Sequence, residues 1–296
     1  MEPDPTTERR ANLIGSAWMV LAMACFAIED VLIKIVSASV PTGQILMLFG
    51  LGGALLFSYS AKRSGANLWA PAAHSKPMLC RAAFEVFGRL FYALAVILTP
   101  LSSTTAILQA TSIVVVAGAA LFFGEKVGVR RWIAIIVGLI GVLIIIQPGA
   151  SSFNALSVLA VLGMLGLAGR DLATRASPAS LETAVLGFYG FVAVILAGLI
   201  YHLWEAKSIV MPSVNVSLYL LSSILVGVVA YIGIIKAMRT GEVSAVVPFR
   251  YSRLLFGVTL GVVLFGESLE WTTLLGCALI VSSGLFLLFR GNTKWS

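Results

Sequence analysis

Charged and aromatic side chains recur at helical spacing within the apolar stretch 78–98. Arg81, Glu85, Arg89 and Tyr92 are separated by four, four and three residues, which places them on one stripe of a helix. Charges inside a membrane helix are costly and usually face a cavity or a partner. Two interpretations stay open: the stripe lines the path of a solute, or it forms a ladder of ion pairs between helices. We expect Arg81, nearest the helix start, to extend its head group toward water.

A second group follows a proline in the stretch 243–265: Pro248, Phe249, Arg250, Tyr251 and Arg253. A proline inside a helix bends it and frees a backbone carbonyl. Arginine stacks on rings and grips carboxylates, so this segment is typical of a site for a flat or anionic solute. Its counterpart in the first half is 106–111, where Gln109 stands opposite Tyr251 and no charge occurs. The alternative is that Arg250 neutralises Glu85 or Glu29.

The third group consists of two similar segments, which contain Glu29, Asp30 and Lys34, and Arg170, Asp171 and Arg175. Each segment places an Asp four residues before a base on one helix face. With the N-terminus inside, the first segment lies in the outer half of its helix and the second near the inner end. We expect a pair of gates, and a carboxylate here could also carry a coupling proton. The alternative is an interfacial ion pair that anchors the helices.

Composition requires that the helices carrying these residues lie in a membrane. The 296 residues are 59% hydrophobic and 11% charged, whereas soluble domains are about 25% charged. Five uncharged stretches are long enough for helices that cross a bilayer: 35–61, 91–124, 132–169, 208–235 and 271–289. The net charge of +7 is therefore better explained by membrane orientation than by nucleic-acid binding.

Turn-forming residues divide the chain into ten expected transmembrane helices. The expected spans are 13–36, 43–61, 78–98, 102–123, 131–147, 154–174, 181–203, 215–238, 243–265 and 271–289. With both termini in the cytoplasm, the inner segments hold nearly all basic residues and the outer loops essentially only Lys207. The inner set is Arg9, Arg10, Lys62, Arg63, Lys76, Arg81, Lys126, Arg130, Arg131, Arg170, Arg175, Arg239, Arg290 and Lys294.

An internal repeat relates the two halves of the chain. Phe123-Gly124-Glu125 recurs as Phe265-Gly266-Glu267, 142 residues later, and the Asp30 and Asp171 segments match at nearly the same offset. We expect Glu125 and Glu267 to bond the start of the next helix. Five helices per repeat is an odd number, so the second copy enters the membrane inverted, as in many carriers.

The paired Phe-Gly-Glu segments, the ten-helix pattern and the run Gly138-Leu139-Ile140-Gly141-Val142 resemble the EamA family of the drug/metabolite transporter superfamily. The resemblance implies an all-α integral membrane fold of ten transmembrane helices as two inverted five-helix repeats. The expected repeats are 12–148 and 153–290, and the segments 1–11 and 291–296 are expected to be cytoplasmic tails. The family further implies a central cavity lined by both repeats and no ATP hydrolysis.

The predicted function is a secondary active transporter of the bacterial inner membrane that moves a small organic metabolite by alternating access. The arginines and aromatics favour a planar or anionic solute, with a riboflavin-like flavin first and amino acids or S-adenosylmethionine-like compounds as alternatives. A membrane-embedded enzyme or a channel is the rival class, although the chain has only two histidines and no phosphate-binding or nucleophile motif. No cofactor and no metal site are expected, and the sequence leaves open whether the chain forms a homodimer.

Overall fold

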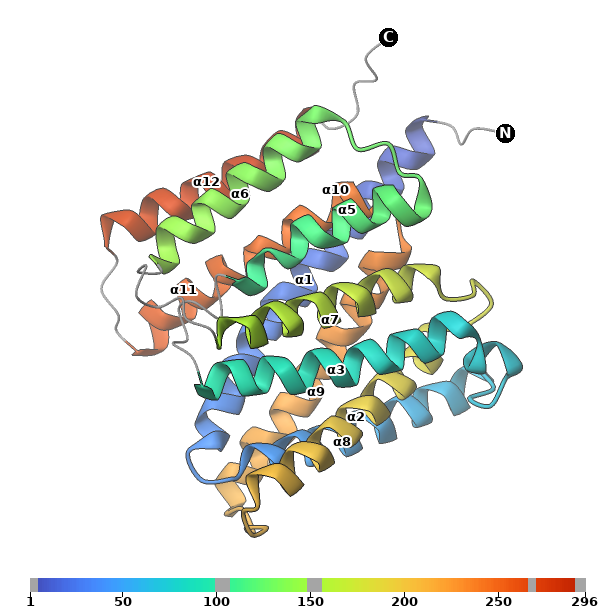
Figure 1. The fold of residues 1–296 in the computed structure, drawn as a ribbon, viewed down its shortest axis with the longest axis vertical. Coiled ribbons are helices and arrows are strands. Elements are labelled where there is room, and N and C mark those ends of the chain that lie inside the picture. Colours follow the sequence, from blue (N-terminus) through green and yellow to red (C-terminus); the bar gives the residue numbers. More distant parts are fainter. Residues whose placement is uncertain (1–4, 99–106, 148–155, 266–269, 291–296) are drawn as a thin grey trace.

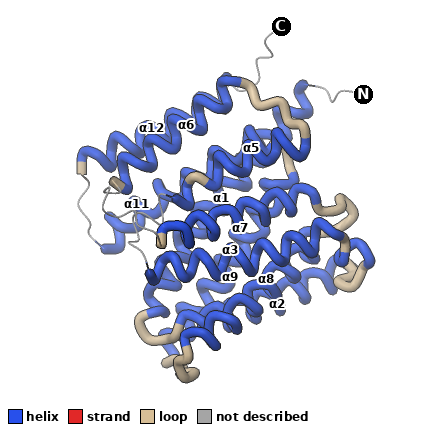
Figure 2. Tube along the Cα trace, viewed as in Figure 1, coloured by secondary structure: helices blue, strands red, loops and turns tan. Residues whose placement is uncertain are grey.

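The computed structural model describes residues 5–98, 107–147, 156–265 and 270–290, which form a bundle of helices without strands (Figure 2). The first half contains α1 (Pro5–Ser37), α2 (Thr42–Ser64), η1 (Pro71–His74), α3 (Lys76–Leu98), α5 (Thr111–Phe123) and α6 (Val129–Ile146). The second half contains α7 (Ser157–Ala176), α8 (Thr183–Glu205), α9 (Val214–Arg239), α10 (Val243–Val246), η3 (Val247–Tyr251), α11 (Ser252–Phe265) and α12 (Trp271–Arg290). If α10, η3 and α11 are counted as one interrupted span, the described helices follow the predicted order of ten spans.

Apolar composition and length explain most of these helices. Six spans in the described part of the chain are long and apolar enough to cross a membrane: α2, α6, α7, α8, α9 and residues 243–264. Shorter apolar helices cover 107–123 and 271–286. The all-helical membrane fold is therefore confirmed, and carboxylates and arginines interrupt the apolar sequence in α1, α3 and α7.

The helix pairing has the symmetry expected of two related halves. The most extensive packing joins α2 to α8, α3 to α7, α1 to α9 and α6 to α12 (Figure 1). Exchanging equivalent helices of the halves converts the α1–α9 pair into the α7–α3 pair, and it leaves the other two pairs unchanged. This pairing is what a twofold relation between inverted repeats produces.

Small residues allow these pairs to approach closely. A Cβ atom on Gly88 of α3 would lie 2.9 Å from the backbone nitrogen of Leu167 in α7, and one on Gly166 would lie 2.5 Å from the Cα of Gly88. In the α6–α12 pair, a Cβ on Gly141 of α6 would lie 2.8 Å from the carbonyl oxygen of Gly276 in α12. The glycine run noted in the sequence therefore serves close helix packing.

Pro248 interrupts the ninth span, as predicted. The chain passes from α10 through the 3-10 turn η3 into α11, and Pro248 lies at the start of that turn. The equivalent place in the first half is also interrupted, because the helical residues 107–109 are followed by a turn at Ala110 before α5 begins. Both breaks lie within an expected span, and they carry the polar side chains of Gln109 and Arg250.

Two ends of the bundle can be distinguished. The α2–α3 connection, the start of α1 and the end of α12 lie at one end, on the right in Figure 1, and the α1–α2 and α8–α9 connections lie at the other. Following the predicted orientation, we name these the cytoplasmic end and the outer end. Arg81, Arg131 and Arg170, which belong to the expected inner segments, are buried within the bundle.

The orientation is tested by cysteine labelling in a background that lacks Cys25, Cys80 and Cys277. An impermeant thiol reagent added outside intact cells is expected to label Ser213→Cys, at the start of α9, and to spare Ser64→Cys, at the end of α2. The positive-inside charge distribution is the physical reason. Labelling of Ser64→Cys and protection of Ser213→Cys would reverse the assignment of the two ends.

Candidate functional site

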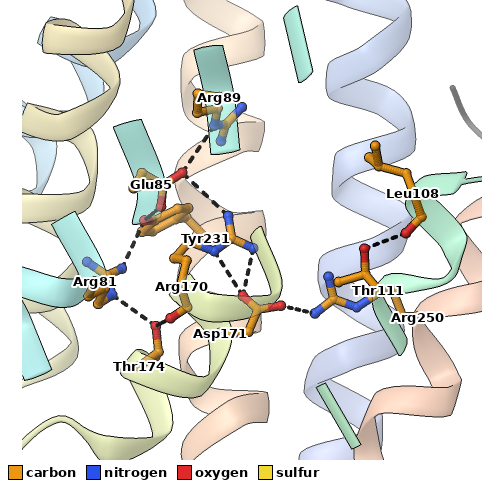
Figure 3. Close-up of polar contacts among 10 residues, drawn as sticks. All are labelled: Arg81, Glu85, Arg89, Leu108, Thr111, Arg170, Asp171, Thr174, Tyr231 and Arg250. Atoms are coloured by element: carbon orange, nitrogen blue, oxygen red, sulfur yellow. Dashed lines mark hydrogen bonds and ion pairs between the residues drawn. The ribbon is translucent and has the colours of Figure 1, made fainter. Parts of the chain in front are cut away.

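Glu85 of α3 is the centre of a buried polar network. Its side chain is 0% exposed, and it accepts hydrogen bonds from three groups (Figure 3). Arg89 Nε lies 3.1 Å from Oε1, Arg170 Nη1 of α7 lies 3.4 Å from the same oxygen, and the Tyr231 hydroxyl of α9 lies 2.7 Å from Oε2. Because a buried carboxylate requires partners, this constellation holds three helices together around one charge.

The network continues from Glu85 to the interrupted ninth span. Arg170 donates from Nε and Nη2 to Oδ1 of the neighbouring Asp171, at 2.9 and 2.7 Å. Asp171 accepts an ion-paired hydrogen bond from Arg250 through its other oxygen (Figure 3). A chain of alternating charge therefore runs from α3 through α7 to η3. The alternative interpretation, that Arg250 neutralises Glu85 or Glu29, is corrected, since the observed partner is Asp171.

Arg81 closes the other side of the network. It is 1% exposed, and it donates to the Tyr231 hydroxyl and to Thr174 Oγ1, both at 2.9 Å. The expectation that Arg81 extends toward water is wrong, because its helix stripe faces α7 and α9 instead of the membrane surface. Thr174 and Tyr231 are therefore polar partners whose role could not be read from the sequence, because hydroxyl groups are common in membrane helices without any such contact.

A separate ion pair joins the two halves nearer the outer end. Arg253 of α11 donates to both oxygens of Asp30 in α1, at 2.6 Å each from Nη2, with a further contact of 3.0 Å from Nε. The Arg253 guanidinium also lies over the Phe26 ring, 5.2 Å from its centroid. The Arg253 and Asp30 side chains are 37% and 54% exposed, so this pair is accessible where the Glu85 network is not.

Glu29 is buried beside this pair, on the same helix as Asp30. Its Oε2 atom has no hydrogen-bond partner among the described residues, and a Cβ atom on Gly227 of α9 would lie 3.0 Å from it. Within the charge network, Arg81 Nη1 and Arg250 Nε are also buried without a hydrogen-bond partner among the described residues. A buried polar atom without a protein partner is available to water or to a bound solute.

The remaining residues predicted for the site are placed in different surroundings. Tyr92 is half-buried on α3, and its backbone packs against Gly163 of α7. Tyr251 is completely buried against α6 and α12, in a cluster with Val142 and Ile280. Gln109 is half-buried at the break before α5, and Lys34 is exposed near the outer end of α1.

Glu125 forms a closed contact at the cytoplasmic end. Its carboxylate accepts hydrogen bonds from the backbone nitrogens of Val243 and Ser244, at 3.0 and 3.1 Å, and it lies 3.8 Å from Arg175 of α7. Gly124 ends α5 at a φ of 64°, in the left-handed region that favours glycine, and so turns Glu125 toward α10. Glu125 therefore bonds a helix start as expected, but that helix is α10 of the other half instead of the next one. Glu267 lies outside the described residues.

Further contacts close the same end. Arg131 of α6 is ion-paired with Glu242 and donates to Ser244 Oγ at 2.5 Å. Asn12 of α1 accepts from the Glu242 backbone nitrogen at 2.7 Å. Three helices thus converge on the start of α10. No group of three or more His, Cys, Asp or Glu side chains in the described ranges has a geometry that could hold a metal ion.

Known proteins resemble this chain in sequence. A model of the EamA-like transporter family matches the chain twice, over residues 13–147 and 155–289. A riboflavin transporter of Rhizobium johnstonii is 27% identical, with 93% of this chain and 91% of the relative covered. The pseudopaline exporter CntI of Pseudomonas aeruginosa is 29% identical, with 90% and 93% covered.

One relative of lower identity and one solved structure also resemble this chain. An S-adenosylmethionine uptake transporter of Rickettsia bellii is 21% identical, with 96% of both chains covered. A protein of known crystal structure matches with a TM-score of 0.78 over 94% of this chain and 96% of its own, at 20% identity. That structural match establishes the fold and no more.

Proposed function

Because this chain belongs to the EamA-like transporter family, we propose that it is a secondary active carrier of a small organic metabolite, working by alternating access in a bacterial inner membrane. The chain is a multi-pass membrane protein, and the relatives that it resembles are transporters. The repeat boundaries 12–148 and 153–290 and the cytoplasmic position of both termini form part of this proposal. No enzymatic activity is proposed.

One observation carries the proposal: a buried chain of ion pairs connects the two halves at the middle of the bundle. Glu85 belongs to the first half, and Arg170, Asp171 and Arg250 belong to the second. Carriers built from inverted repeats place their substrate site at such a junction. The unpartnered Arg250 Nε supplies a donor there that a solute can satisfy.

The accessibility of the charges supports the conformational part of the proposal. The cytoplasmic end is closed by Glu125 and Arg131 on the start of α10, while the Asp30–Arg253 pair on the outer side is exposed. We assign this arrangement to the state in which the cytoplasmic gate is shut. Opening would require that Glu125 release the backbone of α10 and that Arg175 separate from Glu125. Asp171, which bridges Arg170 and Arg250, would be the element that changes partner.

The substrate is proposed to be a planar, riboflavin-like compound. The Glu85 network and the Asp30–Arg253 pair, with Glu29 beside it, contain five arginines and four carboxylates. This excess of arginines leaves donor groups for the carbonyl or ring-nitrogen acceptors of a solute. The members are Arg81, Arg89, Arg170, Arg250, Arg253, Glu29, Asp30, Glu85 and Asp171. Arg253 already lies over an aromatic ring, and guanidinium groups stack equally on a flat heterocycle. The riboflavin transporter among the relatives is consistent with this chemistry.

A second candidate rests on Glu29. A buried carboxylate oxygen without a partner is suited to a cationic group, and the sulfonium of S-adenosylmethionine is such a group on a compound with a flat base. The uptake transporter of Rickettsia bellii carries that compound. Glu29→Gln should abolish binding of a sulfonium solute but leave the binding of a neutral flavin largely intact.

Ligand-induced thermal stabilisation tests both candidates. Purified protein is expected to melt at a higher temperature with riboflavin, since a ligand at 100 times its Kd adds about 2.7 kcal/mol to stability. S-Adenosylmethionine and aromatic amino acids complete the panel, and Arg253→Gln serves as the variant with a weakened site. Stabilisation by S-adenosylmethionine alone would favour the second candidate, and no shift with any compound would reject the substrate class.

A further inference from the structure

A cavity lies at the cytoplasmic end between α2, α8 and α9, apart from the charge network. Its volume is about 620 Å³, inside the range of roughly 300–1,000 Å³ that is usual for ligand pockets. Phe57 lines this cavity and contacts the Tyr231 ring edge-on, with centroids 6.3 Å apart. Because the Tyr231 hydroxyl bonds Glu85, these two rings stand between the cavity and the network. The cavity is therefore a separate site.

The depth of the cavity corresponds to the membrane surface. Tyr59 and Arg63 are exposed on the last turns of α2, where Arg63 Nε donates to the Tyr59 hydroxyl at 2.9 Å. Tyrosine and arginine side chains in such pairs are typical of the boundary between the hydrocarbon core and the head groups. Ser60 and Ser64, which line the cavity, occupy the same turns of α2. The cavity thus opens at the level of the lipid head groups.

An apolar stripe on α9 leads to the cavity from the hydrocarbon region. Leu218, Leu221, Leu225 and Val229 are exposed, and Ile232 and Lys236 continue the same helical spacing into the lining. Exposed apolar side chains on a transmembrane helix face lipid. An acyl chain lying along this stripe would bring its head group to Lys236.

The lining is basic and rich in hydroxyl groups. Lys236 and Arg239 make no ion pair with a carboxylate of the described residues. The Lys236 ammonium lies 4.2 Å from the centroid of the Trp18 ring, and Arg239 donates to backbone carbonyls between α7 and α8. Glu182 is the one acid of the lining in the part of the chain that the structure describes, and it is exposed. The cavity therefore has excess positive charge.

We propose that this cavity binds the head group of an anionic phospholipid from the cytoplasmic leaflet. The phosphodiester would lie against the Lys236 ammonium and accept from the hydroxyls of Ser60 and Thr183 at the cavity wall. Basic pockets between transmembrane helices on the cytoplasmic side recognise such head groups. Bound lipid would join α2 to α9 at the end of the bundle that contains the Glu125 contact. The proposal does not depend on which solute the protein carries.

The test uses full-length protein in phosphatidylcholine nanodiscs that contain or lack phosphatidylglycerol. Native mass spectrometry counts the phosphatidylglycerol that stays bound after release from the disc. Lys236→Gln is expected to reduce retention at least about tenfold, because the phosphodiester loses a hydrogen bond from a charged donor. Ser60→Glu, which places a carboxylate in the lining, is expected to reduce it at least as much. Lys236→Arg should retain the lipid.

Lys62→Gln is the matched control, because Lys62 is exposed at the same end of α2 and does not line the cavity. Equal loss of lipid in Lys62→Gln and Lys236→Gln would show attraction by surface potential alone and would overturn the site. Unchanged retention in Ser60→Glu would overturn it as well, and this variant remains informative if Lys236→Gln fails to fold. Displacement of the lipid by inorganic phosphate would identify a site for soluble anions instead of lipid.

Discussion

Glu85→Gln is expected to abolish uptake and to lower the melting temperature of the purified protein. The substitution keeps the size of the side chain but removes the charge that faces Arg89, Arg170 and the Tyr231 hydroxyl. Removing one partner of a buried pair costs about 3–5 kcal/mol, because the remaining charge has no counter-ion. Uptake in proteoliposomes and thermal melting in detergent measure the two effects.

Two controls separate loss of charge from general damage. Glu270→Gln makes the same chemical change at an exposed carboxylate at the start of α12 and should leave uptake and melting unchanged. Glu85→Asp keeps the charge at a shorter reach and should retain part of the stability. Normal uptake by Glu85→Gln would show that the ion-pair chain between the halves is not needed for transport.

Arg250→Gln is expected to lose solute affinity that no change in its partner restores. The single variant leaves Asp171 with only the Arg170 contact, so it combines a lost solute contact with a disturbed ion pair. In Arg250→Gln with Asp171→Asn, both charges of that pair are removed, and stability should recover in part, because Arg170 keeps its ion pair with Glu85. Affinity should stay about 10–100 times lower, since a hydrogen bond to a charged group contributes about 1.5–3 kcal/mol.

Arg250→Lys refines the same experiment, because a point charge cannot reproduce the planar fork of a guanidinium. This variant should keep the ion pair with Asp171 and still bind the solute more weakly. Solute affinity is measured by thermal shift or fluorescence quenching in parallel with melting temperature. If the double variant regains wild-type affinity, Arg250 belongs to the scaffold and not to the solute site.

Spacing along single helices predicted which residues share a face, but it could not identify the faces that meet. Arg81, Glu85 and Arg89 do form one stripe, as the four-residue spacing indicates. The partners of that stripe, Arg170 and Tyr231, come from α7 and α9, and only the packing of three helices brings them together. The ion pair between Arg250 and Asp171 could not be predicted either, because only helix packing brings η3 next to α7.

The internal repeat predicted the position of Glu125 but not the residues that Glu125 contacts. The Phe-Gly-Glu motif located Glu125 at a helix end, because Gly124 ends α5. Its bonds to Val243 and Ser244 cross from one half to the other, and no local rule predicts a cap that is supplied from 118 and 119 residues away. The ion pair of Arg131 with Glu242 at the start of α10 likewise crosses from one half to the other, and the positive-charge pattern alone could not predict it.

Counterflow in proteoliposomes tests alternating access most directly. Vesicles loaded with excess unlabelled riboflavin and diluted into a trace of labelled riboflavin should show a transient accumulation of label, because a carrier exchanges one solute for another across a single site. Glu85→Gln should show no accumulation. Labelled riboflavin that only equilibrates with the vesicle volume, without a transient excess, would indicate a channel and would contradict the account; no uptake of label by wild-type protein would contradict the proposed substrate.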